Sequence, residues 1–495
     1  MGMHHFLKMK HLGLLFTACV ISLTTARPTS GVAALKKLTP RSPEPLGGYS
    51  LPPLIPHTPL DQTINDVAPP LPILQIPTPA LPNPGYTPSD IKPKKLVFVW
   101  TGAGDNKHAD ILISFSLDDD TFGTVLRVVE VPTSGNSPHH SGVSHDGKTL
   151  WGGGLLALLK TQDTGYYFDV SDVYEPTFWK SDRALLGSIA DEIVAKPEGG
   201  FFITYMGSEV GLAPGRLIET DDNYNIIHEW PEDPAGEANI LESQFSPHGL
   251  SIDFERNLMF TSDFIVPASI LHPISDLNRG ERISADSVRL WDLTDRTILN
   301  TIHIPNGGGI QDVKFIPGNP DGAAIATAVG PGQVWIIYPY QKDSNGKPGR
   351  AELLYDYKLP KTTAIYSTLS KDGRFAYFTF TTANRISALD ISDLSNPIRL
   401  DDPNEVQPTV GPHYLKLTPD EKALVVCDYF VQVGSIGIIN TDADYKVLYI
   451  DVLPNGGLSF NRTIDTAALF PQYGGAKPHS VVVYDLTDPE SPLWY

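Results

Sequence analysis

From about residue 95 onward, short apolar runs alternate with polar turn residues. The runs are rich in Val, Ile, Phe and Tyr and are interrupted by Gly, Pro, Asn and Asp. Four examples are residues 96–100, 200–206, 257–260 and 435–440. Runs of about five residues between such turns are typical of β-strands, and long amphipathic helical patterns are nearly absent. The pattern predicts an all-β protein.

Two turn motifs recur through this region. One is Ser/Thr-x-Asp-Gly or a variant of it, at residues 144–147, 246–249, 370–373 and 418–421. The other is Asp, an aliphatic residue, Ser or Thr, and Asp, at residues 169–172, 292–295, 390–393 and 485–488. In both, Asp and Ser side chains can bond to their own backbone. Their recurrence predicts a β-propeller of six or seven blades.

The first part of the chain has a different character. Lys8 and Lys10 precede an apolar stretch at 12–23 and then small residues, which is the order of a secretory signal peptide. We expect residues 1–26 to be removed and the protein to be secreted. Residues 27–94 are rich in proline and favour an extended leader or linker, with a pro-segment or a surface strap as alternatives. Residues 95–495 then form the propeller domain.

The net charge limits the classes of binding partner, and the cysteine content limits the disulfides that can form. The formal net charge of −20 disfavours nucleic acid, whose binders concentrate Lys and Arg. No later segment is long and apolar enough to span a membrane, and the sequence does not indicate an oligomeric state. Without Cys19 only Cys427 remains, so no intramolecular disulfide is expected. Asn461 begins a glycosylation sequon.

Histidines provide the main candidate chemistry. Four Pro-His steps lie close to predicted strands, and they contain His139, His248, His413 and His479. Propeller blades bring equivalent positions together around a central channel. His140 follows His139 directly, so both face the channel only if their strand bulges. With Glu192 these histidines form a set that binds a metal or donates hydrogen bonds, and the alternative for each single histidine is a structural turn residue.

The motif Pro138-His139-His140-Ser141-Gly142 resembles the His-His-Ser-Gly element of the selenium-binding protein and methanethiol oxidase family. Further segments resemble that family in the same order, at residues 167–170, 257–263, 288–292, 315–321 and 369–393. The resemblance covers roughly residues 95–480. It implies a propeller and, as in some members of the family, oxidation of methanethiol with copper held by histidines near the channel.

The chain also departs from that family pattern. Asp191 and Glu192 stand where the family carries His followed by Cys, and Ser480 follows His479 where the family has Glu. The cysteines near the family's N-terminus are missing as well. A copper site needs several imidazole or thiolate donors, so these differences weaken the expectation of copper.

Three functions follow. The first is a metal-independent enzyme without a cofactor that acts on small organic molecules. In architecture the chain is similar to secreted fungal hetero-Diels-Alderases of tropolone-sesquiterpenoid pathways, which implies the joining of a quinone methide to a polyene such as a sesquiterpene by orienting both partners. The second is a copper-dependent methanethiol oxidase that uses His139, His140, His248, His413 and His479. The third is a non-catalytic binding propeller.

In the cycloaddition hypothesis the polar side chains would donate hydrogen bonds to the substrate oxygen or orient one another. They are His139, His140, Glu192, His248, His413 and His479. Trp151, Tyr205, Phe264 and Tyr414 would enclose the apolar polyene, and the alternative for each of these aromatic residues is core packing between blades. Hydrolases are disfavoured because neither Gly-x-Ser-x-Gly nor His-Glu-x-x-His occurs in the chain.

Overall fold

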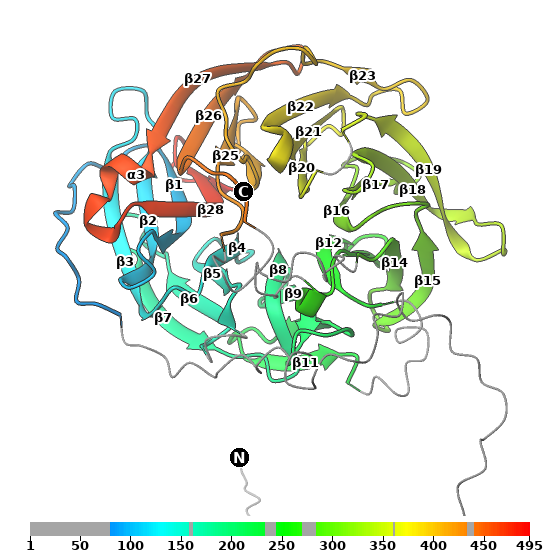
Figure 1. Ribbon diagram of the computed structural model, residues 1–495, viewed down its shortest axis with the longest axis horizontal. Helices are drawn as coiled ribbons and strands as arrows, with labels where there is room; N and C mark the ends of the chain where they lie inside the picture. Colours follow the sequence, from blue (N-terminus) through cyan, green and yellow to red (C-terminus); the bar gives the residue numbers. More distant parts are fainter. Residues whose placement is uncertain (1–79, 158–161, 233–243, 270–283, 360–361, 433–439) are drawn as a thin grey trace, which may run out of the picture. The chain divides into compact units, whose positions relative to one another are not determined.

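The computed structural model describes residues 80–157, 162–232, 244–269, 284–359, 362–432 and 440–495. They belong to a compact unit from Ile64 to Tyr495. The expected signal peptide, most of the leader and most of the expected strand at 435–440 lie outside the described residues. The described part is all-β, and seven sheets surround a central axis (Figure 1). The fold is therefore a β-propeller, and seven is the right blade number of the two predicted.

Six blades are four-stranded meanders built from consecutive strands. The first three contain β4 (Pro138–Val143), β5 (Thr149–Gly154), β6 (Gly165–Asp169) and β7 (Thr177–Asp182); β8 (Gly187–Ala195), β9 (Phe201–Ser208), β10 (Arg216–Thr220) and β11 (Ile226–Trp230); and β12 (Pro247–Asp253), β13 (Leu258–Asp263), β14 (Ser287–Asp292) and β15 (Thr297–His303). The next three contain β16 (Ile310–Phe315), β17 (Ala324–Ala328), β18 (Gln333–Lys342) and β19 (Pro348–Asp356); β20 (Ile365–Leu369), β21 (Phe375–Phe380), β22 (Arg385–Asp390) and β23 (Ile398–Arg399); and β24 (Leu415–Leu417), β25 (Ala423–Cys427), β26 (Lys446–Val452) and β27 (Leu458–Asp465).

The seventh sheet closes the ring by joining distant parts of the chain. Its order is β29-β28-β1-β2-β3. The strands are β1 (Lys95–Ala103), β2 (Ala109–Ser116), β3 (Val125–Ser134), β28 (Ala476–Asp485) and β29 (Leu493–Trp494). β1 pairs with β28 along its whole length, from Lys95 with Asp485 to Ala103 with Ala476. Hydrogen bonds between early and late strands thus hold the first and last blades together.

The helical elements among the described residues are short and lie between strands. They are η2 (Pro267–Ser269), η4 (Thr381–Ala383), α3 (Thr466–Leu469) and η6 (Pro471–Tyr473). Within the described ranges no helix has the length and apolar character needed to cross a membrane. The first strand of each meander, together with β28, lies innermost, and neighbouring inner strands touch around the axis (Figure 1).

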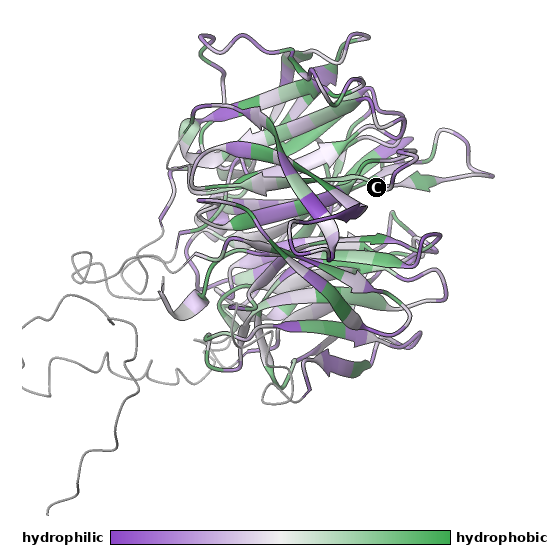
Figure 2. Cartoon of the chain, turned by 90° about the vertical axis from the view of Figure 1, so that its right-hand side faces the viewer, coloured by the Kyte–Doolittle hydropathy of each residue, from purple (hydrophilic) through white to green (hydrophobic). Residues whose placement is uncertain are grey.

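The core consists of the layers between neighbouring blades. On β1, Leu96, Phe98 and Trp100 pack toward Phe168 of the next blade, whereas Val97 and its odd-numbered neighbours join a cluster with the preceding blade. Both faces of such a strand are buried, because side chains alternate from one face to the other. Apolar stretches accordingly follow the strands, and many connecting loops are hydrophilic (Figure 2).

Most of the predicted turn motifs form the expected local hydrogen bonds. Ser144 and Ser370 each donate to the Asp two residues later at 2.6 Å, and Thr418 donates to Asp420 at 2.7 Å. The prediction of a turn at residues 246–249 is wrong. Its third position is His248, which has no carboxylate to bond the turn, and the segment instead enters the inner strand β12.

The described end of the Pro-rich segment lies along the outer strand of the ring-closing blade. Tyr86 donates its hydroxyl to the carbonyl of Val125 at 2.7 Å. The backbone N–H of Ser89 donates to Leu126 at 3.2 Å, and Arg127 donates to the carbonyl of Ser89 at 2.6 Å. Residues 80–94 are thereby attached to β3.

Candidate functional site

An extra residue in the inner strand β4 directs two histidines into the channel. β4 pairs Pro138 with Gly154 and Ser141 with Gly152, so His139 and His140 together oppose a single residue. A β-bulge of this kind re-aims the side chains beside it. The two imidazole rings lie stacked, with centroids 4.4 Å apart and an interplanar angle of 14°. Both histidines therefore point to the same side, which the sequence allowed only for a bulged strand.

The same irregularity occurs at equivalent points of other inner strands. The register shifts lie at Asp191-Glu192 in β8, His248-Gly249 in β12 and Gln311-Asp312 in β16, and His479 is the extra residue in β28. Before β24, the N–H of His413 donates to Cys427, and the N–H of Cys427 donates to Tyr414. The blades thus present matching positions to the axis.

Hydroxyl groups on the second strands hold these bulges in place. Thr204, opposite the β8 bulge, accepts the N–H of Glu192 at 3.0 Å and donates to the carbonyl of His248. Ser262 accepts from Gly249 and donates to Gln311, both at 3.1 Å. Each hydroxyl satisfies a backbone group that the bulge removes from the strand ladder and ties one blade to the next.

Residues at equivalent positions of the blades form three layers along the channel. The first layer contains His139, Asp191, His248, Gln311, His413 and His479, all at most 1% exposed. The second layer contains His140, Glu192, Asp312, Tyr366 and Tyr414, all at most 4% exposed. The third layer, two residues further along β16 and β24, contains Lys314 and Lys416, which are partly exposed. The side chains that line the channel thus change from mainly imidazoles in the first layer, to carboxylates and phenols in the second, to amines in the third.

Five imidazoles form one cluster across the first two layers. His479 lies 4.4 Å from His139, 4.9 Å from His413 and 5.5 Å from His140, measured between ring centroids. One potential ligand atom from each of these four residues lies within 4.8 Å of the other three. A second group of the same closeness joins His139, Asp191 and His248. This geometry can hold a metal ion.

Hydrogen bonding sets the tautomer of His139. Its Nδ1 lies 2.7 Å from the carbonyl of Ala190 and 3.2 Å from Oδ1 of Asp191. A carbonyl only accepts, so Nδ1 carries the proton and Nε2 keeps its lone pair. Among the described residues, Nε2 of His139 and both ring nitrogens of His140 and His413 have no hydrogen-bond partner. Buried polar atoms are usually paired, so these nitrogens suit a metal or a bound molecule.

Burial keeps the imidazoles neutral. It lowers the pKa of His139 to about 4, against the opposing effect of the Ala190 carbonyl. It also lowers the pKa of the other four well below their ordinary value, and the neighbouring imidazoles add to the effect. Neutral imidazole is the form that binds metals. Burial and the charge of Glu192 raise the pKa of Asp191 well above its ordinary value.

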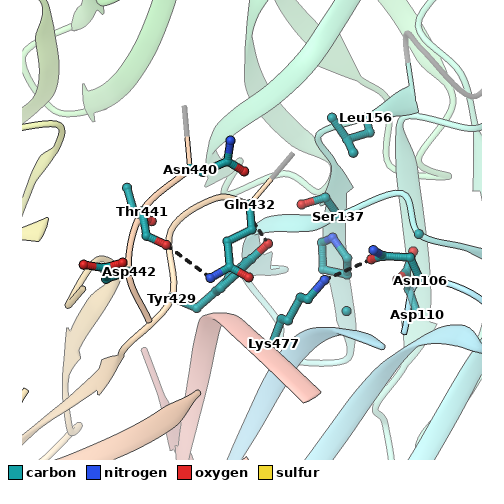
Figure 3. Close-up of a pocket in the computed structure, with 13 residues that line it drawn as sticks. Asn106, Asp110, Ser137, Leu156, Tyr429, Gln432, Asn440, Thr441, Asp442 and Lys477 are labelled. Carbon is teal, nitrogen blue, oxygen red and sulfur yellow. Dashed lines mark hydrogen bonds between the residues drawn. The ribbon is translucent and has the colours of Figure 1, made fainter. Parts of the chain in front are cut away.

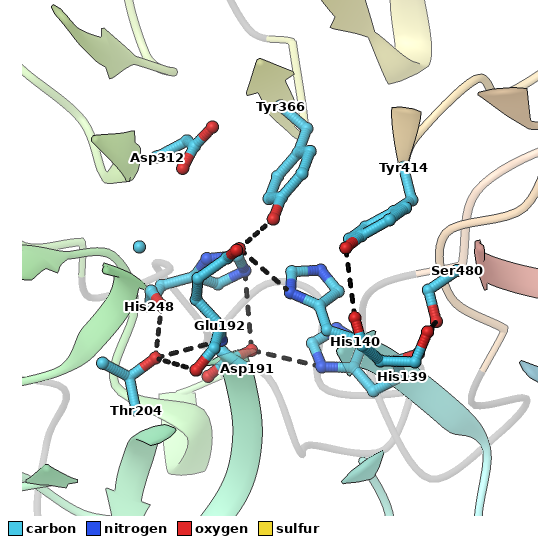
Figure 4. Close-up of polar contacts among 12 residues, drawn as sticks. His139, His140, Asp191, Glu192, Thr204, His248, Asp312, Tyr366, Tyr414 and Ser480 are labelled. Atoms are coloured by element: carbon cyan, nitrogen blue, oxygen red, sulfur yellow. Dashed lines mark hydrogen bonds and ion pairs between the residues drawn. The ribbon is translucent and has the colours of Figure 1, made fainter. Parts of the chain in front are cut away.

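Glu192 is the centre of the second layer (Figure 4). Its Oε2 accepts a hydrogen bond from the Tyr366 hydroxyl and lies 3.8 Å from Nδ1 of His140. Its Oε1 lies 3.1 Å from Nζ of Lys314, which is also 3.1 Å from Asp312. Burial raises the pKa of Glu192, whereas Lys314 and Lys416 oppose that shift. This carboxylate therefore links the imidazole cluster to the lysines.

The structure brings most of the predicted site residues together. All five histidines and Glu192 meet in the channel, and the ring of Phe264 lies 5.2 Å from His248 while that of Tyr414 lies 5.1 Å from His140. Trp151 and Tyr205 instead belong to a core cluster with Tyr167. They lie on the second strands β5 and β9, whose side chains face neighbouring blades. Their position favours core packing, the alternative that the sequence left open.

Sequence reasoning missed several channel residues. They are Asp312, Lys314, Tyr366 and Lys416, together with Asp191 as a member of the first layer. Asp312 follows Gln311 in its bulge just as Glu192 follows Asp191. That correspondence was the available signal, but it appears only when the inner strands are aligned by their bulges.

A cavity of about 490 Å³ lies beside the first layer (Figure 3). Pro138, Tyr429 and Lys477 line it, and the ring of Tyr429 lies 6.0 Å from that of His479. Nζ of Lys477 donates to Asn106 at 3.0 Å. Asn106, Asp110, Ser137, Gln432 and Thr441 make much of the remaining wall polar. A polar molecule in this cavity would lie next to the imidazoles.

No family model matches the chain. Methanethiol oxidase of Ruegeria pomeroyi is 27% identical over 279 residues, which cover 51% of this chain and 61% of that protein. The chain is therefore distantly similar to a methanethiol oxidase. The match spans less than two thirds of the length of that relative.

Solved structures agree on the fold. A hypothetical selenium-binding protein from Sulfolobus tokodaii aligns with a TM-score of 0.61 and 16% identity, over 79% of this chain and 94% of that one. A periplasmic gluconolactonase from Pseudomonas aeruginosa aligns with a TM-score of 0.52 and 13% identity, over 78% and 98% of the two chains. At these identities the likeness concerns the propeller alone.

Proposed function

We propose that the protein is a secreted, copper-dependent oxidase of a small thiol. The observation that carries the proposal is the cluster of His139, His140, His413 and His479, whose potential ligand atoms lie within 4.8 Å of one another. These imidazoles are buried, and their lowered pKa values favour the neutral form. The distant relationship to methanethiol oxidase supports the choice of reaction.

The donor set fits copper. Imidazole nitrogen is a good ligand for copper, which binds nitrogen sites more tightly than the other divalent first-row metals. The ring nitrogens of His140 and His413 lack other partners among the described residues, and the Ala190 carbonyl leaves Nε2 of His139 available. Copper would therefore be held by His139, His140, His413 and His479, with Asp191 and Glu192 beside the ligands.

The proposed reaction is a two-electron oxidation. A primary thiol loses two electrons and two protons to give a thioaldehyde, and water converts that thioaldehyde to an aldehyde and hydrogen sulfide. Dioxygen takes up the two electrons and two protons and leaves as hydrogen peroxide. Bound copper would supply the one-electron steps between the thiol and dioxygen.

The protein's own residues would bind and orient the substrate. In this proposal the thiol would reach the imidazoles through the cavity beside the first layer, and the ammonium group of Lys477 lies in the wall of that cavity. A nearby positive charge favours thiolate over thiol. Asp191 lies 3.2 Å from Nδ1 of His139, and Glu192 lies 3.8 Å from Nδ1 of His140. Such carboxyl groups orient metal-binding imidazoles.

The proposal is tested with methanethiol and dioxygen as substrates. We expect aldehyde, sulfide and hydrogen peroxide in equal amounts, loss of turnover after chelation, and recovery with copper. His413→Ala should abolish turnover, whereas the matched control His303→Ala should retain it because that side chain is 59% exposed and pairs with Asp286. Turnover that survives exhaustive chelation would overturn the proposal.

One observation favours a second function, the metal-independent hetero-Diels-Alder reaction. Neutral imidazoles each carry an N–H, and those of His140 and His413 have no partner among the described residues. They would donate hydrogen bonds to the oxygen of a quinone methide as negative charge develops there, with Phe264 and Tyr414 beside a polyene. Accelerated cycloaddition by chelated protein would support this function, and a rate equal to that in buffer would exclude it.

A further inference from the structure

The two lysines of the third layer have unequal partners. Lys314 lies 3.1 Å from Glu192 and 3.1 Å from Asp312, so it is bound by two carboxylates. Lys416 forms no hydrogen bond and no ion pair with any residue that the structure describes. Its Nζ instead lies 5.6 Å from the ring centroids of Tyr414 and Tyr495. The ammonium form of Lys416 therefore has less counter-charge around it than the ammonium form of Lys314.

The surroundings of Lys416 disfavour its charged form. Burial lowers the pKa of Lys416, Glu192 and Asp312 oppose that shift, and the like charge of Lys314 adds to it. The carboxylates come from β8 and β16 and already bind Lys314. The two tyrosine rings lie close to the outer limit of about 6 Å for a cation–π contact, so they replace little of the missing counter-charge.

We propose that Lys416 is a nucleophilic amine that forms an imine with a small aldehyde or ketone that enters the channel. Its side chain is partly exposed on the inner strand β24, and a lysine beside a second cation is a known arrangement for such chemistry. The amine adds to the carbonyl carbon to form a carbinolamine, which loses water to give the imine, so no oxidant or reductant is needed. Imine formation at Lys416 is a different reaction from thiol oxidation, and it does not depend on a metal.

Reductive alkylation tests the proposal directly. Chelated, metal-free protein is treated with acetaldehyde and cyanoborohydride at neutral pH, and ethylated lysines are mapped by mass spectrometry over time. Lys422 is the internal control because its side chain is 79% exposed. We expect Lys416 to be modified at least about tenfold faster than Lys422, since a lowered pKa increases the neutral fraction. Modification that follows exposure, with Lys422 ahead, would overturn the proposal.

Two variants test the amine of Lys416 and its surroundings independently. Lys416→Arg should remove the trapped adduct without changing the labelling of Lys422. Lys314→Met would leave Glu192 and Asp312 free to hold the ammonium form of Lys416, so labelling of Lys416 should slow at least about fivefold. An unchanged rate at Lys416 in a folded Lys314→Met protein would contradict the proposed environment. Because metal is absent throughout, the result is independent of thiol oxidation.

Discussion

At the scale of the residue, His139 combines a fixed tautomer with a strongly lowered pKa. The Ala190 carbonyl accepts from Nδ1 at 2.7 Å, and burial lowers the pKa to about 4. The sequence indicated this residue through its Pro-His step and through its neighbour His140. It did not indicate the proton position, because that depends on Ala190 in the next blade.

The stability of the metal-free protein should therefore depend on pH. The ordinary pKa of His139 is 6.5, and the folded value is about 4, so the unfolded chain binds the proton more readily. The contribution of His139 to the free energy of unfolding is complete above pH 6.5. It is lost as the pH falls, and the loss is about 3 kcal/mol at pH 4. Asp191 shifts in the opposite direction, so the comparison must be made between wild type and a variant.

Urea unfolding of wild type and His139→Asn at several pH values measures this contribution. We expect the free energies of unfolding of the two proteins to converge as the pH falls from about 6.5 to 4. Parallel curves over that range would mean that His139 titrates normally in the folded protein.

At the scale of the element, the bulges determine what the channel contains. The sequence predicted strands and turns, because apolar runs and Asp-containing turns are local features. It did not predict the bulges, because a register shift depends on pairing between two strands. For the same reason Asp312, Lys314, Tyr366 and Lys416 were missed, since no local motif distinguishes them from surface residues.

The hydroxyl of Thr204 provides a test of how the bulges are held. It accepts the N–H of Glu192 and donates to His248. Thr204→Val should lower the free energy of unfolding by about 1–3 kcal/mol, because a buried backbone N–H and a buried carbonyl lose their partner. Thr204→Ser keeps the hydroxyl and serves as the control. Equal stability of the Val and Ser variants would show that the hydroxyl does not support the bulge.

Also at this scale, the sequence pattern did not distinguish aromatic residues of the core from aromatic residues of the channel. Trp151 and Tyr205 are aromatic residues of strand-rich segments, but the sequence does not tell which neighbouring blade each side chain meets. Trp151 packs with Tyr167 in a core cluster, whereas Phe264 reaches His248. Only the strand order around the axis separates these two outcomes.

At the scale of the whole molecule, the ring is closed by β1 and β28, and the site depends on that closure. His479 comes from β28, and its ring lies 4.4 Å from that of His139 on β4. The cluster therefore requires the last strand to pair with the first. Repeated turns predicted the ring, whereas the sequence left six and seven blades open because the strands of this closing blade are far apart in the chain.

Secretion is a prediction for the whole chain. We expect the mature protein to begin near Arg27 and to carry a glycan at Asn461, which is exposed on β27. The intact mass of protein from the culture medium, before and after glycosidase treatment, measures both features. Asn461→Gln is the control for the glycan. Retention of the full-length chain inside the cell would contradict this prediction.

The most direct test of the central claim is the copper content of the protein. Chelated protein is reconstituted with excess copper, freed of unbound metal and analysed by mass spectrometry of the elements, alongside His413→Ala/His479→Ala and His303→Ala. We expect about one tightly bound copper ion per chain in wild type and His303→Ala, and roughly a tenth of that or less in the double variant. Wild type without copper, or a folded double variant with a full complement, would contradict it.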